Sequence, residues 1–173
     1  MKNEVSIKEF QDFDVGDIYK IVRQIYLTSG FMSDNFDRKF PSIAHFNKHF
    51  LQILEKRGSF FLVAISQNKP VGYLVLEANP AENLRHTATL NMGVTDKFRG
   101  MGVGKYLLGQ SLQKAKAEGC TEIVYLMVRA DHGGAIQLYK NAGFHTLTKL
   151  EKDTKINNEY FDGLLMRKFI LRK

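Results

Sequence analysis

The chain has 173 residues, of which 44% are hydrophobic and 25% are charged, and its formal net charge at pH 7 is +7. The length predicts one domain with a core of ordinary size, and the composition excludes a chain that is disordered throughout. The positive charge favours anionic partners such as nucleic acid, phosphorylated cofactors or acidic surfaces. The lysines and arginines are spread along the chain rather than gathered in a block, so charge alone selects none of these partners.

The sequence carries no sign of a membrane segment, a secretion signal or a metal site. No apolar run approaches the ~20 residues needed to cross a bilayer, and residues 1–10 contain no apolar signal-peptide segment. The single cysteine, Cys120, excludes an internal disulfide framework and leaves no zinc pattern. We therefore expect a cytoplasmic protein with no metal and no membrane attachment.

The N-terminal half predicts a strand, two helices and a hairpin, in that order. Alternating apolar residues in "EVSIKEFQDFD" (4–14) indicate the first strand, and helical spacing predicts a helix from Asp14 or Asp17. Residues 28–41 break that periodicity with glycine, serine, aspartate and proline. A second helix is expected over Ser42–Lys56, and "SFFLVAIS" and "PVGYLVLE", separated by "QNKP", predict a hairpin.

The C-terminal half predicts strands that alternate with helices. A strand in "HTATLNMGVT" (86–95) precedes a helix that runs to about Glu118, with Gly119 as its C-terminal cap. The nearly unbroken apolar run "EIVYLMV" (122–128) indicates a strand covered on both faces. A short helix in "GAIQLYKNAG" (134–143) and two strands, at 145–152 and 159–171, complete the chain. The order predicts a mixed α/β sheet with helices on its faces.

Three glycines open the helix that follows the 86–95 strand. The first four N–H groups of a helix lack internal acceptors and carry partial positive charge, which suits a phosphate when side chains do not screen the backbone. Gly100, Gly102 and Gly104 would remove that screen, and Arg99 and Lys105 would add charge. The spacing matches neither a P-loop nor a dinucleotide fingerprint. A tight turn without any ligand is the alternative interpretation.

The pattern R-x-x-G-x-G in "RGMGVG" (99–104) resembles the pyrophosphate signature of the GNAT superfamily of N-acetyltransferases. "VRADHGGAIQLYKNAGF" (128–144) resembles the second motif of this family, and "EYFDGLLMRKFI" (159–170) its closing strand. The resemblance implies a single domain over 1–173, with an acceptor-side part at about 1–85 and an acetyl-CoA-binding core at about 86–169. It also implies a mixed twisted sheet of six to seven strands with helices on both faces, in which the fourth and fifth strands diverge.

The resemblance implies acetyl-CoA as co-substrate and an amine as acceptor. The amides of residues 100–105 would hold its pyrophosphate, and the strand edge at 92–94 would bind its pantetheine arm. His132 stands where the family often has an asparagine that opens the helix. The implied cofactor-binding residues are Met92, Gly93, Val94, Arg99, Gly100, Met101, Gly102, Val103, Gly104, Lys105, His132, Ala135 and Tyr139.

Tyr139 stands where the family's tyrosine protonates the coenzyme sulfur, so the resemblance assigns it the general acid. From spacing alone, a core aromatic on a short helix is the alternative. For the general base, His86 occupies the family position of a glutamate thirteen residues before Arg99, and a solvated loop histidine is the equal alternative. Glu77, Glu82 or a chain of waters are further candidates, whereas Met127, at another family position for a base, cannot serve.

The acceptor side is expected to hold aromatic residues. Phe31, Phe36 and Phe40 lie in a polar segment and are the candidates for the wall of the acceptor pocket, whereas Phe46 and Phe50 are expected on the inner face of a helix. Two other functions stay open: a non-catalytic acyl-CoA-binding sensor, and a basic nucleic-acid-binding module. The second lacks a recognised motif, so we expect no nucleic-acid partner. For the oligomeric state, a homodimer is one alternative that the sequence leaves open.

Overall fold

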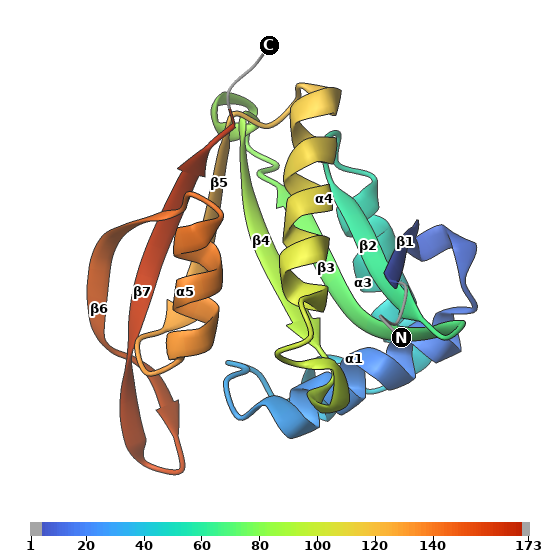
Figure 1. The fold of residues 1–173 in the computed structure, drawn as a ribbon, viewed down its shortest axis with the longest axis horizontal. Helices are drawn as coiled ribbons and strands as arrows, with labels where there is room; N and C mark the ends of the chain where they lie inside the picture. Colours follow the sequence, from blue (N-terminus) through green and yellow to red (C-terminus); the bar gives the residue numbers. More distant parts are fainter. Residues whose placement is uncertain (1–4, 171–173) are drawn as a thin grey trace.

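A computed structural model describes residues 5–170 and contains one sheet of seven strands in the order β1-β2-β3-β4-β5-β7-β6 (Figure 1). The only parallel pair in that sheet, within the described residues, is β4 with β5. The strands are β1 (Val5–Glu9), β2 (Phe60–Ser66), β3 (Lys69–Ala78), β4 (Thr87–Val94), β5 (Ile123–Arg129), β6 (His145–Ile156) and β7 (Glu159–Phe169). The expected end of the last strand, Leu171, lies outside the described residues.

Helices cover both faces of the sheet, as the family resemblance implied (Figure 1). One face carries α4 (Val103–Glu118) and α5 (Gly133–Asn141), and the other carries α1 (Val15–Ser29), α2 (Phe36–Lys39) and α3 (Ile43–Leu54). Four of these helices were expected from the sequence, and the expected bounds lie within two residues of those found at α3 and α5. The mixed α/β fold is therefore confirmed.

The sheet separates two hydrophobic cores of different composition. The core under α4 and α5 is mainly aliphatic and contains Leu107, Leu108 and Val124. The core under α1–α3 is rich in aromatic rings, which come from both helices and strands: Phe10, Phe36, Phe40, Phe46, Phe50, Phe61 and Tyr73. Alternate residues of β2 and β3 enter the two cores, because successive side chains of a strand point to opposite faces.

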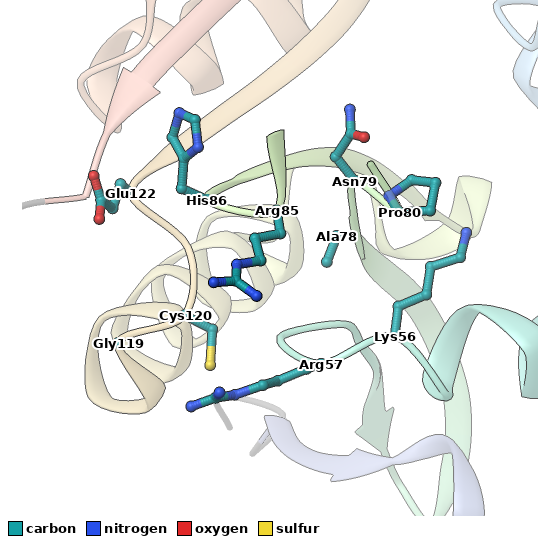
Figure 2. Close-up of a pocket in the computed structure, with 10 residues that line it drawn as sticks. All are labelled: Lys56, Arg57, Ala78, Asn79, Pro80, Arg85, His86, Gly119, Cys120 and Glu122. Atoms are coloured by element: carbon teal, nitrogen blue, oxygen red, sulfur yellow. The ribbon is translucent and has the colours of Figure 1, made fainter. Parts of the chain in front are cut away.

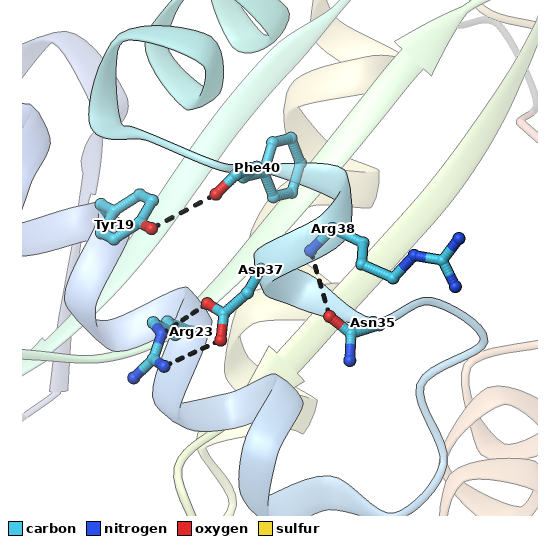
Figure 3. Close-up of polar contacts among 6 residues, drawn as sticks. All are labelled: Tyr19, Arg23, Asn35, Asp37, Arg38 and Phe40. Carbon is cyan, nitrogen blue, oxygen red and sulfur yellow. Dashed lines mark hydrogen bonds and ion pairs between the residues drawn. The ribbon is translucent and has the colours of Figure 1, made fainter.

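Helix α2 is the element that the sequence analysis missed. The side chain of Asn35 accepts from the N–H of Arg38 and begins the helix, and Arg23 of α1 holds Asp37 through two hydrogen bonds of 2.7 and 2.9 Å (Figure 3). The hydroxyl of Tyr19 donates to the carbonyl of Phe40 at 3.3 Å. A helix of four residues carries too little periodicity to be recognised in a sequence.

Strands β4 and β5 pair only at their beginnings. Thr87–Thr89 lie opposite Ile123–Tyr125, and no β5 residue pairs with residues 90–94. Strand β5 stays paired with β7 over its whole length, so β5, β7 and β6 turn away from β4 together (Figure 1). This is the divergence that the family resemblance implied, and it leaves one edge of β4 open.

One expectation about β5 was wrong. The apolar run indicated a strand covered on both faces, but only Val124, Leu126 and Val128 are buried, on the side of α4 and α5. On the other face Tyr125 is half-buried and Met127 is 44% exposed. Because β5 diverges from β4, helices α1–α3 do not extend over this part of the sheet.

Gly93 lets α1 approach β4 closely. A Cβ atom added at Gly93 would lie 2.5 Å from Cγ2 of Ile25 and 3.0 Å from Cε1 of Tyr73. Both neighbours belong to the aromatic-rich core and have little room to move. The absence of a side chain at this position therefore sets the distance between α1 and the sheet.

We expect Gly93→Ala to lower the free energy of unfolding by about 1–3 kcal/mol, the usual cost of an overpacked core. Urea unfolding followed by circular dichroism measures this. The matched control is Gly109→Ala in the middle of α4, where an added Cβ meets nothing within 4 Å, and which should gain about 0.5–1 kcal/mol. Equal stability of Gly93→Ala and the unmodified protein would contradict this account.

Candidate functional site

The turn between β4 and α4 is open beside two of its glycines. Gly100 and Gly102 have φ angles of +73° and +86°, in the left-handed region that favours glycine, and Cβ atoms added there would meet nothing within 4 Å. Gly102 begins α4, and no side chain caps that end of the helix. The first-turn amides therefore have neither an internal acceptor nor a capping group, which makes this turn suited to an anion.

The third glycine of the signature has a different environment. A Cβ at Gly104 would lie 3.4 Å from Cε of Met92 and 3.5 Å from Cδ2 of Leu138. The first turn of α4 is thus in van der Waals range of β4 and of α5 together. The turn, the open edge of β4 at residues 92–94 and helix α5 consequently meet at one place.

The signature arginine points away from the open turn. Nε of Arg99 donates to the carbonyl of Val94 at 3.0 Å, and its terminal nitrogens donate to the carbonyl and hydroxyl oxygens of Thr28 at 3.4 and 3.3 Å. Arg99 therefore joins the end of β4 to the last turn of α1. Lys105 is exposed in the first turn of α4 and supplies positive charge there.

Tyr139 is buried on α5, with 8% of its surface exposed, and its ring packs against Phe144 with 5.8 Å between centroids. Burial raises the pKa of Tyr139 to about 12, so its phenol holds its proton at neutral pH. Within residues 5–170 no hydrogen-bond acceptor is found for that phenol. Burial also raises the pKa of Tyr73 on β3, with smaller contributions from Tyr26 and Tyr139.

His132, which stands where the family often has asparagine, caps α5. Its Nδ1 accepts from the N–H of Ala135 at 3.4 Å, and its ring stacks on Phe31 with 3.8 Å between centroids. Burial lowers the pKa of His132, and the charges of Arg99 and Arg129 add to this effect against the opposing effect of Asp131. The ring is therefore neutral at pH 7, the state in which Nδ1 can accept a hydrogen bond.

Arg129, which the sequence analysis did not single out, ties the segment after α1 to β5. Its guanidinium pairs with Asp131 through two hydrogen bonds and donates to the carbonyl of Gly30 at 2.9 Å. It also lies over the rings of Phe31 and Phe161, at 5.0 and 3.7 Å from their centroids. Only 9% of the side chain is exposed. The available signal was its place at the end of the apolar β5 strand, but Gly30, Phe31 and Phe161 are far away in sequence.

Two of the three candidates for the acceptor wall belong to the core. Phe36 and Phe40 are each 2% exposed and pack on Phe46, so they present no surface to a substrate. The polar residues around them suggested a loop, but with α2 both rings point into the aromatic-rich core. Phe31 is half-buried beside His132, at the end of β5 where the sheet is uncovered. Phe46 and Phe50 are buried, as expected.

The structure does not bring His86 to the turn. His86 precedes β4, whereas the turn follows the last β4 residue, Val94, so the two lie at opposite ends of an eight-residue strand. Glu82 lies near the same far end, in the exposed segment before His86. Glu77 of β3 is opposite Thr89, the last β4 residue before the strands diverge, and its carboxylate pairs with Lys56. Of these three candidates, Glu77 is the one nearest to the open edge.

On the same sheet face as Glu77, Tyr73 donates its hydroxyl to Oδ1 of Asn91 at 2.8 Å. Asn91 is exposed, and it lies on the part of β4 that has no β5 partner. The alternation along β3 places Tyr73 and Glu77 on one face, a signal that the sequence analysis did not use. These polar groups, with Phe31 and Met127, border the uncovered part of the sheet.

Residues 5–170 show neither a metal site nor a membrane-spanning helix. In that part of the chain, no three histidine, cysteine, aspartate or glutamate side chains gather in a way that could hold a metal ion. No helix there is long and apolar enough to span a membrane.

The comparisons with known proteins place the chain in a family. The model of the acetyltransferase (GNAT) family matches residues 19–144, so the chain belongs to that family. An acetyltransferase of the GNAT family from Streptococcus pneumoniae has the same fold, with a TM-score of 0.89 at 21% identity over 97% of this chain and all of that chain. A GNAT phosphinothricin acetyltransferase from Sinorhizobium meliloti, solved in complex with AcCoA, has a TM-score of 0.82 at 19% identity over 98% and 89% of the two chains.

Among curated proteins, an N-alpha-acetyltransferase of Sulfolobus acidocaldarius is 34% identical over 110 residues, which are 59% of this chain and 66% of that protein. The matches to three curated relatives span 43%, 66% and 70% of those relatives' lengths. The similarity to these relatives is therefore partial.

We expect Arg129→Lys to loosen the segment after α1, because lysine keeps the charge but loses the planar fork that reaches Asp131 and Gly30 together. The local loss should be about 1–3 kcal/mol, measured as faster amide hydrogen exchange over residues 30–35. Arg23→Lys, which changes an exposed two-bond pair with Asp37, is the control and should leave residues 30–35 unaffected. Unchanged exchange in Arg129→Lys would refute the bracing role.

Proposed function

We propose that this chain is an acetyl-CoA-dependent N-acetyltransferase that transfers the acetyl group directly to a primary amine of a small molecule or of a protein or peptide. The observation that carries the proposal is the open turn at 100–105, which lies beside the unpaired edge of β4 and, at Gly104, close to Leu138, the residue before the buried Tyr139 on α5. The relative named an N-alpha-acetyltransferase and the solved structure that holds AcCoA support the same activity.

The residues at the turn fit the coenzyme. Gly100 and Gly102 leave the amides uncovered, and no side chain competes for the first turn of α4. A diphosphate there would gain hydrogen bonds from those amides and favourable charge from the helix dipole and Lys105. The free main-chain groups of residues 92–94 would bind the amides of the pantetheine arm, as an additional strand would.

Bound acetyl-CoA would supply the reactive thioester and, after transfer, the thiolate of the coenzyme. Tyr139 would give its phenolic proton to that thiolate sulfur as the carbon–sulfur bond breaks, and would regain a proton from solvent. The burial that raises the pKa of Tyr139 also raises the proton affinity of a thiolate held nearby, which reduces the mismatch between the two groups.

The acceptor amine would approach from the uncovered sheet face, past Phe31, Asn91 and Met127. It must lose a proton to become the product amide. We assign this proton to Glu77, directly or through water, rather than to His86, because Glu77 lies opposite Thr89 where the strands diverge. Cys120 follows the end of α4, at the end of the helix opposite the turn, so the acetyl group passes to the amine without a cysteine carrier.

Gly102→Val should raise the Kd of coenzyme A at least tenfold, which corresponds to about 1.4 kcal/mol, because a β-branched residue resists a φ of +86° and covers the amides. Isothermal titration calorimetry measures the Kd. Gly109→Val, on the same helix but in open space, is the matched control and should bind as the unmodified protein does. Equal Kd values for the two variants would contradict the binding of coenzyme A at this turn.

Tyr139→Phe should lower kcat by about 10²-fold or more in an assay of thiol release over a panel of amines, with little effect on the KM for acetyl-CoA. Tyr160→Phe, an exposed tyrosine on β7, is the control. Because the pKa of Tyr139 is about 12, the unmodified enzyme should show no fall in kcat from this group below about pH 11.

Two outcomes would count against this proposal. Full activity of Tyr139→Phe would exclude the tyrosine as the acid. Tight binding of acetyl-CoA without thiol release for any amine in the panel would contradict catalysis and would favour a protein that only binds acyl-CoA.

A further inference from the structure

A cavity of about 580 Å³ lies at the end of the sheet where β4 begins (Figure 2). Three connections form it: the one between α3 and β2, the one between β3 and β4, and the one between α4 and β5. The open turn at 100–105 lies beyond the other end of β4 and contributes no residue to the lining. The cavity is therefore separate from the proposed coenzyme-binding turn.

Two arginines extend into this cavity from different connections. Arg57 and Arg85 reach toward the same space beside Cys120, while the ring of His86 projects away from them (Figure 2). Within residues 5–170, neither guanidinium forms a hydrogen bond or an ion pair. By contrast, Arg23 and Arg129 each hold an aspartate through two hydrogen bonds. The neighbouring lysine in the lining, Lys56, is paired with Glu77.

The walls of the cavity are fixed by main-chain contacts. The carbonyl of His86 accepts from the N–H groups of Glu122 and Ile123, at 2.7 and 3.2 Å, which joins two of the three connections. Gly58 has a φ of +90°, and a Cβ added to it would lie 2.9 Å from Cβ of Cys120, so the third connection packs directly on the cysteine. The two arginines thus project from supports that are held at a set separation.

We propose that this cavity binds the phosphate group of a small phosphorylated molecule, which Arg57 and Arg85 clasp between them. Guanidinium forks match the oxygens of a phosphate in geometry and in charge. The volume lies within the range of about 300–1,000 Å³ that is typical of sites for small molecules. The proposal does not depend on the proposed acetyltransferase activity, because it uses none of the residues of that site.

The lining favours a small molecule over a nucleic acid. Sequence-tolerant binding of single strands uses aromatic side chains on which bases stack, along a basic groove. No phenylalanine, tyrosine or tryptophan lines this cavity. Two converging arginines in a concave space suit one phosphate group better than a continuous backbone.

The experiment uses Cys120, the only cysteine of the chain, as a reporter of occupancy. The rate of Cys120 alkylation by iodoacetamide is measured during titration with inorganic phosphate, and separately with adenosine 5′-monophosphate. We expect at least a fivefold slower reaction at saturation. In Arg57→Gln/Arg85→Gln the concentration for half-protection should rise at least tenfold. Protection by both anions identifies phosphate itself as the recognised group, and protection by the nucleotide alone adds a requirement for the organic part.

Matched variants separate this cavity from the open turn. Arg38→Gln, at another exposed arginine, and Gly102→Val, at the turn, should keep the protection by phosphate. Circular dichroism checks that the double variant folds. If it does not fold, Arg85→Gln alone replaces it, and we expect this variant to show an intermediate loss of protection. Absence of saturable protection, equal protection in the double variant, or loss of protection in Gly102→Val would overturn the proposal. Protection by a single-stranded RNA without protection by either phosphate compound would overturn it in favour of a nucleic-acid surface.

Discussion

The short parallel pairing of β4 with β5 is the constraint on which the rest of the structure depends. Three residues of each strand pair, and beyond Thr89 the two halves of the sheet separate. Each half keeps its own antiparallel partners, so within the described residues the separation leaves two facing edges without a strand partner, that of β5 beyond Tyr125 and that of β4 beyond Thr89. Unpaired strand edges are rare in the middle of a sheet, because they leave polar groups to be satisfied. Here that edge ends at a helix whose first amides are also unsatisfied.

The N-terminal half joins the two separated halves at the other end. Arg99 connects the end of β4 to Thr28, and Arg129 and His132 connect the end of β5 to Gly30 and Phe31. These contacts are polar or stacked rather than part of either hydrophobic core, and most of them involve exposed groups. Contacts of this kind open more readily than buried cores do. The segment after α1 is thus held to the two halves of the sheet by contacts outside both hydrophobic cores.

Much of this arrangement follows from local sequence signals, whereas the acceptor side does not. Asp14, Ser42 and the hairpin at 67–68 mark their elements by turn and capping chemistry, and the signature at 99–104 marks the open turn before α4. Phe36 and Phe40 were expected at a pocket wall and lie in the aromatic core, a position that the sequence did not indicate because four-residue α2 carries no periodicity and their partners are distant. The bracing role of Arg129 could not be predicted for the same reason. It depends on contacts with Gly30 and Phe161, which lie near Arg129 only in the tertiary structure.

The division of the interior into an aliphatic core and an aromatic core has an evolutionary consequence. Since the sheet lies between them, substitutions among the rings beneath α1–α3 can reshape one side while the other side keeps its packing. New specificities could therefore arise in the first half of the chain without rebuilding the second. Gly93 limits the independence of the two sides. At Gly93, helix α1 packs on β4, and the edge of β4 that does not pair with β3 is the open one.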